Sequence, residues 1–262
     1  MDQQSIIETA HAMADAARQA VLPHFRSAGL AADNKAAGGF DPVTEGDRAA
    51  ERAMRDILAA RRPQDGILGE EYGTRTGSSG LTWVLDPIDG TRGFLSGTPT
   101  WGVLISLADE TGPIYGLIDQ PYIGERFEGG FGRARVCGPQ GEAPLATRAD
   151  RPLAQSILFT TFPELGTPEE AAAFRAVSDQ VQLTRYGMDC YAYALIAAGQ
   201  IDLVIEAGLA PYDIQAPIAV IEAAGGIVTD WRGGPVHHGG RVLAAASRQQ
   251  HDAALDVLSR VA

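Results

Sequence analysis

The sequence predicts an α/β fold of the mixed (α+β) kind, in which a half built from helices and a sheet precedes a half where strands and helices alternate. Residues 6–22 and 43–63 carry apolar side chains at helical spacing, and short apolar runs separated by turn signals follow them. The second half of the chain switches repeatedly between strand-like and helix-like patterns. We therefore expect one domain at 1–150 and another at 151–262, with the boundary near Asp150.

Local signals set the individual elements. The first helix stops at Pro23, and the second has Thr44 as its N-cap and ends before Pro63. A Gly/Ala-rich loop with one lysine, Lys35, joins them. Strands are expected at 83–85, 103–107, 114–118, 157–160, 201–207, 227–231 and 242–246, and further helices at 168–182, 190–199, 214–226 and up to residue 258.

Composition excludes several classes of protein. The chain has 262 residues, 45% of them hydrophobic, which is enough for one large or two small cores. Its net charge of −12 argues against a nucleic-acid partner, which would require a basic face. The two cysteines lie far apart, so neither a disulfide framework nor a zinc site is indicated. The N-terminus carries Asp2 and Glu8 and no apolar run reaches membrane-spanning length, so we expect a cytoplasmic protein with no membrane partner.

Acidic residues follow short apolar runs at several places. Asp86 and Asp89 end the run in "WVLDPIDGTRGF", where two carboxylates leaving water beside each other require a positive charge. Glu70 and Glu71 follow another run, and Asp213 begins an apolar helix. Such oxygen-only sets suit Mg²⁺, and no histidine or cysteine accompanies them to favour zinc. Taken singly, Asp213 is also a suitable helix N-cap, Glu70 or Glu71 a surface acid, and Asp89 part of a D-G turn.

Three motifs together carry a family resemblance. "GEE", "WVLDPIDGTRGF" and "PYDIQAPIAVIEAAGG" resemble the inositol monophosphatase family of Mg²⁺-dependent, lithium-sensitive phosphomonoesterases. The third motif has Tyr-Asp where the family commonly has Trp-Asp, and the resemblance extends over nearly the whole chain. It implies a layered α-β-α-β-α sandwich of the inositol monophosphatase and fructose bisphosphatase type. It also implies in-line attack of a metal-activated water on a phosphomonoester, without a covalent phosphoenzyme.

The same resemblance implies the roles of individual residues. Asp86 would bridge two Mg²⁺ ions roughly 3.5–4 Å apart, with a third ion and substitution by Mn²⁺ also expected. Thr91 and Asp47 would orient the attacking water, although Thr44-x-x-Asp47 also matches a capping box. Gly90 and Thr91 would bind phosphate at a helix start. Lys35 matches a mobile-loop lysine near the third ion. The implied metal ligands are Glu70, Asp86, the backbone carbonyl of Ile88, Asp89 and Asp213, and the implied catalytic residues are Asp47, Thr91 and Glu70.

The segments "DGTRGF", "LSGTPTWGVLISL", "LAPYDIQA" and "YGMDCYAYALIAAGQIDLVIEA" resemble the histidinol-phosphate phosphatase subgroup of the same superfamily. This implies hydrolysis of histidinol phosphate in histidine biosynthesis. Asp189 and Glu206 would then face the ammonium group, although Asp189 also suits a helix cap and Arg92 suits an ion pair with Glu71. The implied substrate-binding residues are Gly90, Thr91, Arg92, Asp189, Glu206 and Asp213.

Other functions stay open at this point. Inositol 1-phosphate, fructose bisphosphate and adenosine 3',5'-bisphosphate are alternative substrates, although no second cationic subsite for a bisphosphate is evident. Some members of the family also bind transcription or ribosomal machinery, and a pure adaptor would release no phosphate when Mg²⁺ is supplied. The partners expected here are a small phosphorylated substrate and, in a homodimer, a second copy of the chain.

Overall fold

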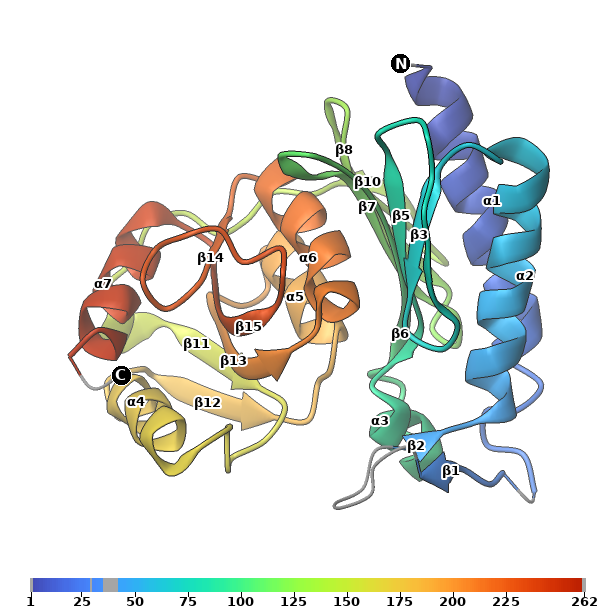
Figure 1. Ribbon diagram of the computed structural model, residues 1–262. Coiled ribbons are helices and arrows are strands. Elements are labelled where there is room, and N and C mark those ends of the chain that lie inside the picture. The colour runs from blue at the N-terminus through green and yellow to red at the C-terminus, as the bar shows by residue number, and fades with distance from the viewer. Residues whose placement is uncertain (1, 29, 35–41, 261–262) are drawn as a thin grey trace.

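The computed structural model describes residues 2–28, 30–34 and 42–260, and it has five alternating layers of helices and sheets (Figure 1). Helices α1 and α2 form the first layer, followed by an eight-stranded sheet, helices α5 and α6, a five-stranded sheet, and helices α4 and α7. The layered α-β-α-β-α sandwich is therefore confirmed.

The first layer pairs α1 (Gln3–Val21) with α2 (Glu45–Arg61) against one face of the large sheet. The Asp2 side chain caps α1 by accepting the N–H of Ser5, and Thr44 caps α2. Each helix buries one stripe of small and apolar side chains, as expected for helices that cover a sheet. On α1 the buried apolar residues are Ile6, Ile7, Ala10, Met13, Ala14, Ala17 and Val21.

The large sheet has the strand order β10-β9-β8-β7-β6-β5-β3-β4, and all its neighbouring strands are antiparallel except β3 and β5. The central strands lie between two helical layers, which is why they appear in the sequence as nearly continuous apolar runs. The strands are β3 (Gly66–Gly69), β4 (Gly73–Arg75), β5 (Thr82–Asp89), β6 (Gly102–Asp109), β7 (Gly112–Gln120), β8 (Glu125–Gly130), β9 (Arg133–Gly138) and β10 (Gly141–Pro144).

Strands β8–β10 were not predicted, because charged residues interrupt their apolar pattern. Glu128 is only 2% exposed, and the Arg135 guanidinium and the Tyr115 hydroxyl (2.6 Å) both donate to it. Asp119 of β7 is fully buried and pairs with Arg126 of β8 at 2.7 Å. Buried charges of this kind are tolerated because each has a partner of opposite charge. No sequence pattern indicates which residues pair.

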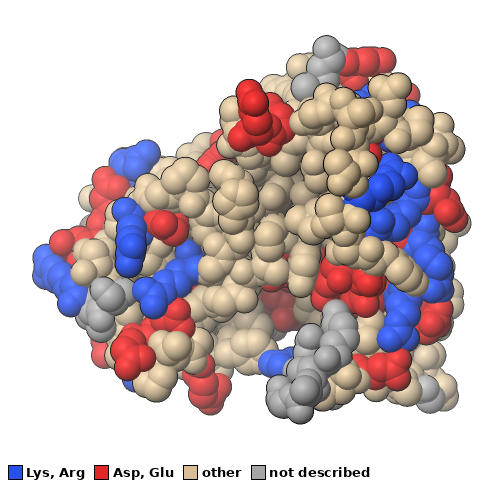
Figure 2. Space-filling model, in the orientation of Figure 1, with Lys and Arg blue, Asp and Glu red and all other residues tan. Residues whose placement is uncertain are grey.

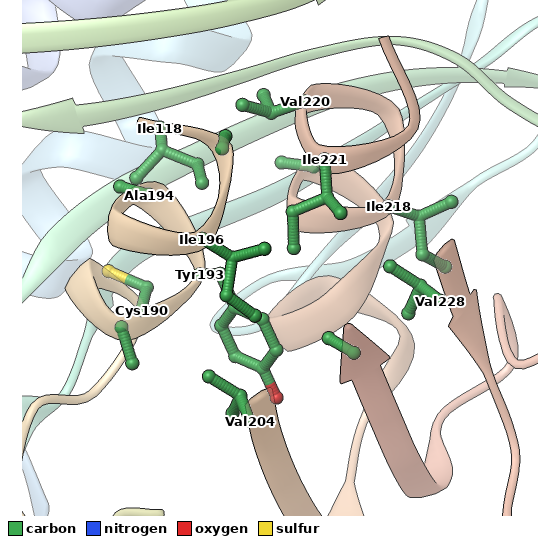
Figure 3. Close-up of a cluster of buried hydrophobic side chains, with 14 of the residues drawn as sticks. Ile118, Cys190, Tyr193, Ala194, Ile196, Val204, Ile218, Val220, Ile221 and Val228 are labelled. Carbon is green, nitrogen blue, oxygen red and sulfur yellow. The ribbon is translucent and has the colours of Figure 1, made fainter. Parts of the chain in front are cut away.

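The middle layer consists of α5 (Tyr191–Ala197) and α6 (Pro211–Ala223). Helix α6 is buried on all sides, as its almost entirely apolar sequence requires. Figure 3 shows the core around it, where Ile118 comes from the large sheet and Val204 and Val228 from the small one. Gly116 lets the α6 backbone lie directly on β7, because a Cβ at Gly116 would come within 2.5 Å of the Ala216 carbonyl.

The small sheet has the order β12-β11-β13-β15-β14, with β11 parallel to both of its neighbours. The helix expected at 168–182 ends at Ser178, because residues 179–182 form the turn that leads into the edge strand β12 at Leu183. The elements are β11 (Ile157–Thr160), α4 (Pro168–Ser178), β12 (Leu183–Tyr186), β13 (Leu203–Leu209), β14 (Ile227–Thr229), β15 (Gly240–Ala245) and α7 (Arg248–Leu258), preceded by the 3-10 turn Leu153–Gln155.

A two-stranded sheet, β1 (Asp33–Asn34) and β2 (Pro42–Val43), lies beside α3 (Thr91–Ser96) at the end of the large sheet (Figure 1). The two main sheets fall on either side of Asp150 in the chain, but α6 from the second half packs on the sheet of the first. A domain boundary near Asp150 stays a prediction. Within the described residues, no helix is both long and apolar enough to cross a membrane.

Candidate active site

The end of strand β5 carries the first two acids of the site. Pro87 cannot donate to a neighbouring strand, and the pairing of β5 with β6 shifts between Asp86 and Asp89. The N–H of Ile88 instead donates to the Asp86 carboxylate at 3.0 Å. This irregular strand end therefore presents both carboxylates at one edge of the sheet.

Helix α6 brings the third acid to the same place. Its first turn holds Asp213, whose Oδ2 accepts the N–H of Ala210 at 2.7 Å. One carboxylate oxygen each from Asp86, Asp89 and Asp213 lie within 4.8 Å of one another. The expected alternative role of Asp213 as the helix N-cap is therefore wrong: Ala210 is the N-cap, and Asp213 lies three residues after it and accepts its N–H.

Burial and mutual repulsion both act on this cluster. The pKa of Asp86 is raised well above its usual value, first by burial and then by the charges of Glu70, Asp89 and Asp213. Burial and the charges of Asp213 and Asp189 raise the pKa of Asp89, although the N–H of Cys190 donates to it at 2.6 Å. Oxygen donors crowded in this way fit a hard divalent cation, which would remove the repulsion.

Asp47 uses only one of its oxygens for capping. Its Oδ2 accepts the backbone N–H of Thr44 at 2.7 Å and the Thr44 hydroxyl at 2.5 Å, completing the capping box of α2. Its Oδ1 is buried and has no hydrogen-bond partner among the described residues. Burial is the main cause that raises the pKa of Asp47 to about 7, and the charges of Glu70 and Glu71 add to it. Asp47 therefore caps a helix, and the negative charges of nearby site residues also raise its pKa.

Helix α3 begins directly after β5. Its N-cap, Gly90, has a φ of 84°, which favours glycine, and a Cβ there would lie 2.6 Å from the carboxyl carbon of Asp189. The Thr91 hydroxyl donates to the Ile88 carbonyl at 3.1 Å. The turn therefore places Gly90 and Thr91 in the same cleft lining as Asp89 and Asp213, and the first N–H groups of a helix are suitable donors to an anion.

These residues border a cleft of about 450 Å³ between the two sheets. Figure 2 shows acidic side chains inside the hollow of the molecule. The residues implied by the sequence that line it are Glu70, Asp89, Gly90, Thr91, Arg92, Asp189, Glu206 and Asp213. Asp86 belongs to the acid cluster but not to the lining of the cleft. Asp47 is buried and also does not line the cleft, and the charge of Glu70 contributes to its raised pKa. Lys35 lies outside the described residues.

Two further acids line the cleft beside the carboxylate cluster. Asp189 has a φ of 45° and accepts the Thr100 hydroxyl at 2.6 Å, while α5 has no side-chain cap. Glu206 of β13 is 5% exposed and accepts the N–H (2.6 Å) and hydroxyl (2.9 Å) of Thr161. Burial raises the pKa of Glu206 to about 7, and Asp189 contributes to that rise. The two acids therefore belong to one wall of the cleft.

Aromatic side chains also line the cleft, and the sequence analysis did not predict them as site residues. Phe162 is 42% exposed, and its ring centroid lies 4.9 Å from the guanidinium of Arg92, which was predicted to bind substrate. Tyr193 lines the cleft from α5, and its buried hydroxyl has no hydrogen-bond partner among the described residues. Tyr212 lies beside Asp213 at the start of α6. Aromatic residues in apolar surroundings are usually core residues, so nothing in the sequence distinguished these.

The fold and the cleft define a layered α/β protein with a partly buried carboxylate cluster, and comparisons with known proteins agree with this description. The profile of the inositol monophosphatase family matches residues 2–261. The bifunctional phosphatase IMPL2 of Arabidopsis thaliana is 44% identical over 225 residues, which is 85% of this chain and 63% of the plant protein. The histidinol-phosphatase of Mycobacterium tuberculosis is 33% identical over 253 residues, 95% of each chain. The structure of an inositol monophosphatase from Zymomonas mobilis superposes with a TM-score of 0.87 at 37% identity, covering 99% of each chain.

The chain belongs to the inositol monophosphatase family and is a phosphatase of that family. Enzymes of this family depend on metal ions, and the cluster of Asp86, Asp89 and Asp213 offers the ligands that such an ion requires.

Proposed function

We propose that this protein is a Mg²⁺-dependent phosphatase that hydrolyses histidinol phosphate to histidinol and phosphate. Half-buried Asp189 and buried Glu206, two acids that line the cleft, support this choice of substrate. Histidinol phosphate has an ammonium group and an imidazole beyond its phosphate, whereas inositol phosphate has a neutral polyol. Acids held out of water next to a substrate favour a cation there over a neutral group.

Each residue then has a defined part in the reaction. Glu70, Asp86, Asp89, Asp213 and the Ile88 carbonyl would hold the ions. Bound there, Mg²⁺ would neutralise charge and lower the pKa of the attacking water. The backbone at Gly90 and Thr91 would hold the phosphate in line. Asp47 Oδ1 and the Thr91 hydroxyl would orient the water, and Asp47 can accept its proton.

A substrate panel with two isosteric variants tests the choice of substrate. Asp189→Asn and Glu206→Gln remove the charge but keep the shape, and Asn tolerates the left-handed backbone at 189 where Ala would not. Deleting one partner of a desolvated charge pair costs about 2–5 kcal/mol, so the KM for histidinol phosphate should rise about 30-fold or more. The KM for glycerol 2-phosphate, which has no charged group beyond its phosphate, should hardly change.

The exposed acid Glu169 on α4 provides the control, since Glu169→Gln should leave both esters unaffected. Equal losses on both esters, or a wild-type protein that prefers inositol 1-phosphate, would contradict the assignment to histidinol phosphate. Inositol 1-phosphate is the second candidate, because the Zymomonas mobilis structure is an inositol monophosphatase. Failure to release phosphate from any ester with Mg²⁺ would contradict the enzymatic proposal itself and favour an adaptor.

A further inference from the structure

The turn between β3 and β4 is held by a residue that belongs to neither strand. Residues 70–72 connect the strands, and Glu70 is the first of them. Glu51, on helix α2, is fully buried beneath this turn. Its Oε2 accepts the N–H of Glu71 at 2.7 Å, and its Oε1 accepts the N–H of Tyr72 at 3.2 Å. The two peptide groups that follow Glu70 are thus both bound to one carboxylate.

Arg55, one helical turn further along α2, completes this arrangement. Its Nε donates to Glu51 Oε1 at 2.7 Å, and its Nη2 donates to the carbonyl of Gly73 at the start of β4. The backbone at Gly69 lies so close that a Cβ there would fall 1.9 Å from Glu51 Oε1. The Glu51 carboxylate therefore has one ion-pair partner and two backbone donors, and it packs closely against Gly69. These contacts together fix its position.

The position of Glu70 in the cleft depends on this turn. Glu70 lines the cleft together with Asp89 and Asp213, and it sits on a short connection between two strands that by itself restricts the side chain little. The hydrogen bonds to Glu51 anchor the peptide groups on the C-terminal side of Glu70 and so limit its movement away from Asp86.

Helix α2 places Glu51 one turn after Asp47, so that the two acids share one face of the helix. We propose that Glu51 is a positioning residue that, together with Arg55, holds Glu70 in place to bind the metal. This inference rests on the proposed function, in which Glu70 is a ligand. It makes α2 the support for both the water-orienting acid and the turn of one ligand.

The test compares metal binding in the full-length protein and in Glu51→Gln. The amide keeps the size of the side chain but presents a donor to the turn and loses the charge that pairs with Arg55. Changes in groups that support a metal ligand typically weaken binding by about 10–100-fold. We expect that loss for Mg²⁺ by calorimetry and for Mn²⁺ by electron paramagnetic resonance. The Mg²⁺ concentration for half-maximal hydrolysis should rise equally, while kcat at saturating Mg²⁺ stays within a few-fold of wild type.

Hydrogen exchange provides a second readout, because the N–H groups of Glu71 and Tyr72 should exchange faster in Glu51→Gln. Glu128→Gln is the matched control, since Glu128 is equally buried and pairs with an arginine three strands away from β5. It should lower the melting temperature without changing metal affinity. Arg55→Lys removes the bridge between Glu51 and Gly73 and should weaken metal binding in the same direction, which keeps the test decisive if Glu51→Gln does not fold.

The inference would be overturned if Arg55→Lys kept the metal affinity of the wild type and folded Glu51→Gln kept it too, despite faster exchange at residues 71 and 72. The proposed function would then stay intact. Equal losses of metal affinity in Glu51→Gln and Glu128→Gln would also overturn it, because the effect would then be one of general stability. A wild-type protein that binds no metal and hydrolyses no ester would instead overturn the proposed function, and the inference with it.

Discussion

The two carboxylate oxygens of Asp47 lie in different surroundings, and only one of them takes part in helix capping. Oδ2 completes the capping box with Thr44, while Oδ1 is buried without a hydrogen-bond partner in the part of the chain that the structure describes. A residue that only capped its helix would gain nothing from burying the second oxygen, because an unsatisfied buried acceptor costs about 1–3 kcal/mol. The local pattern Thr-x-x-Asp therefore describes half of what the residue does.

Asp47→Asn separates the two roles. Asn can still accept the N–H of Thr44 but cannot take a proton from water, so kcat should fall by roughly 10²–10⁴ with little loss of stability. If Asp47 only capped its helix, Asp47→Asn would leave both stability and kcat nearly normal, because Asn is about as good a cap as Asp. Asp2→Asn at the cap of α1 is the control. A melting curve and a rate on each variant decide between the two outcomes.

The sequence indicates some residues of the site more clearly than others. Asp86, Asp89 and Asp213 could be proposed as a cluster because each follows or begins an apolar element, which the structure places at one edge. Glu51 gave no such signal, since its partners are backbone groups 20 and 21 residues away. Contacts between a side chain and a distant backbone leave no trace in residue type or spacing.

At the scale of elements, α3 is the shortest helix that the site uses, and its geometry depends on one backbone angle. Gly90 turns the chain from β5 into α3 through a left-handed conformation, with Asp189 packed against it. Residue type alone indicated this turn, because D-G-T combines a turn signal with a helix start. Strands β8–β10 gave no comparable signal, since ion pairs replace the apolar alternation that marks a strand.

Gly90→Ala should therefore do more harm than the backbone angle alone predicts. A left-handed backbone costs a non-glycine residue roughly 1–2 kcal/mol. Gly80→Ala is the matched control, because Gly80 has a φ of 80° and nothing within 4 Å of its Cβ position. Both variants should lose that stability in urea unfolding, but only Gly90→Ala should also raise the inhibition constant for inorganic phosphate. Equal phosphate inhibition in the two variants would contradict the role of this turn in binding phosphate.

At the scale of the molecule, the layers hold five acids with raised pKa values around one cleft. These acids are Asp47, Asp86, Asp89, Asp189 and Glu206. The order of layers was predictable because three specific motifs resemble one family. The pairing of strands across each sheet was not, since it depends on contacts between distant segments.

These pKa values give the metal-free protein an unusual dependence on pH. Between the ordinary carboxyl range, roughly pH 4, and about pH 7, the folded state binds more protons than the unfolded chain, so the free energy of unfolding should fall as pH rises. Half-buried His237, whose pKa is lowered mainly by burial, acts in the opposite direction but is a single group. The melting temperature in excess chelator should therefore be lower at pH 8 than at pH 5.5.

Mg²⁺ should reverse this trend, because it binds the ionised acids of the folded state and stabilises that state by mass action. The rise in melting temperature on adding Mg²⁺ should be larger at pH 8 than at pH 5.5. Asp86→Asn should reduce both the fall with pH and the rise with Mg²⁺. A chelated protein that melts at a higher temperature at pH 8 than at pH 5.5 would contradict this account.

The late position of α6 in the chain has a consequence for synthesis. Ribosomes release the N-terminal part first, so Glu70, Asp86 and Asp89 emerge long before Asp213. Until α6 emerges, the face of the large sheet that it covers at Gly116 has no partner, and the acid cluster lacks its third member. A growing chain therefore completes neither its middle layer nor the acid cluster before α6 emerges. One helix completes both in the same late step, after which only β14, β15 and α7 have still to follow.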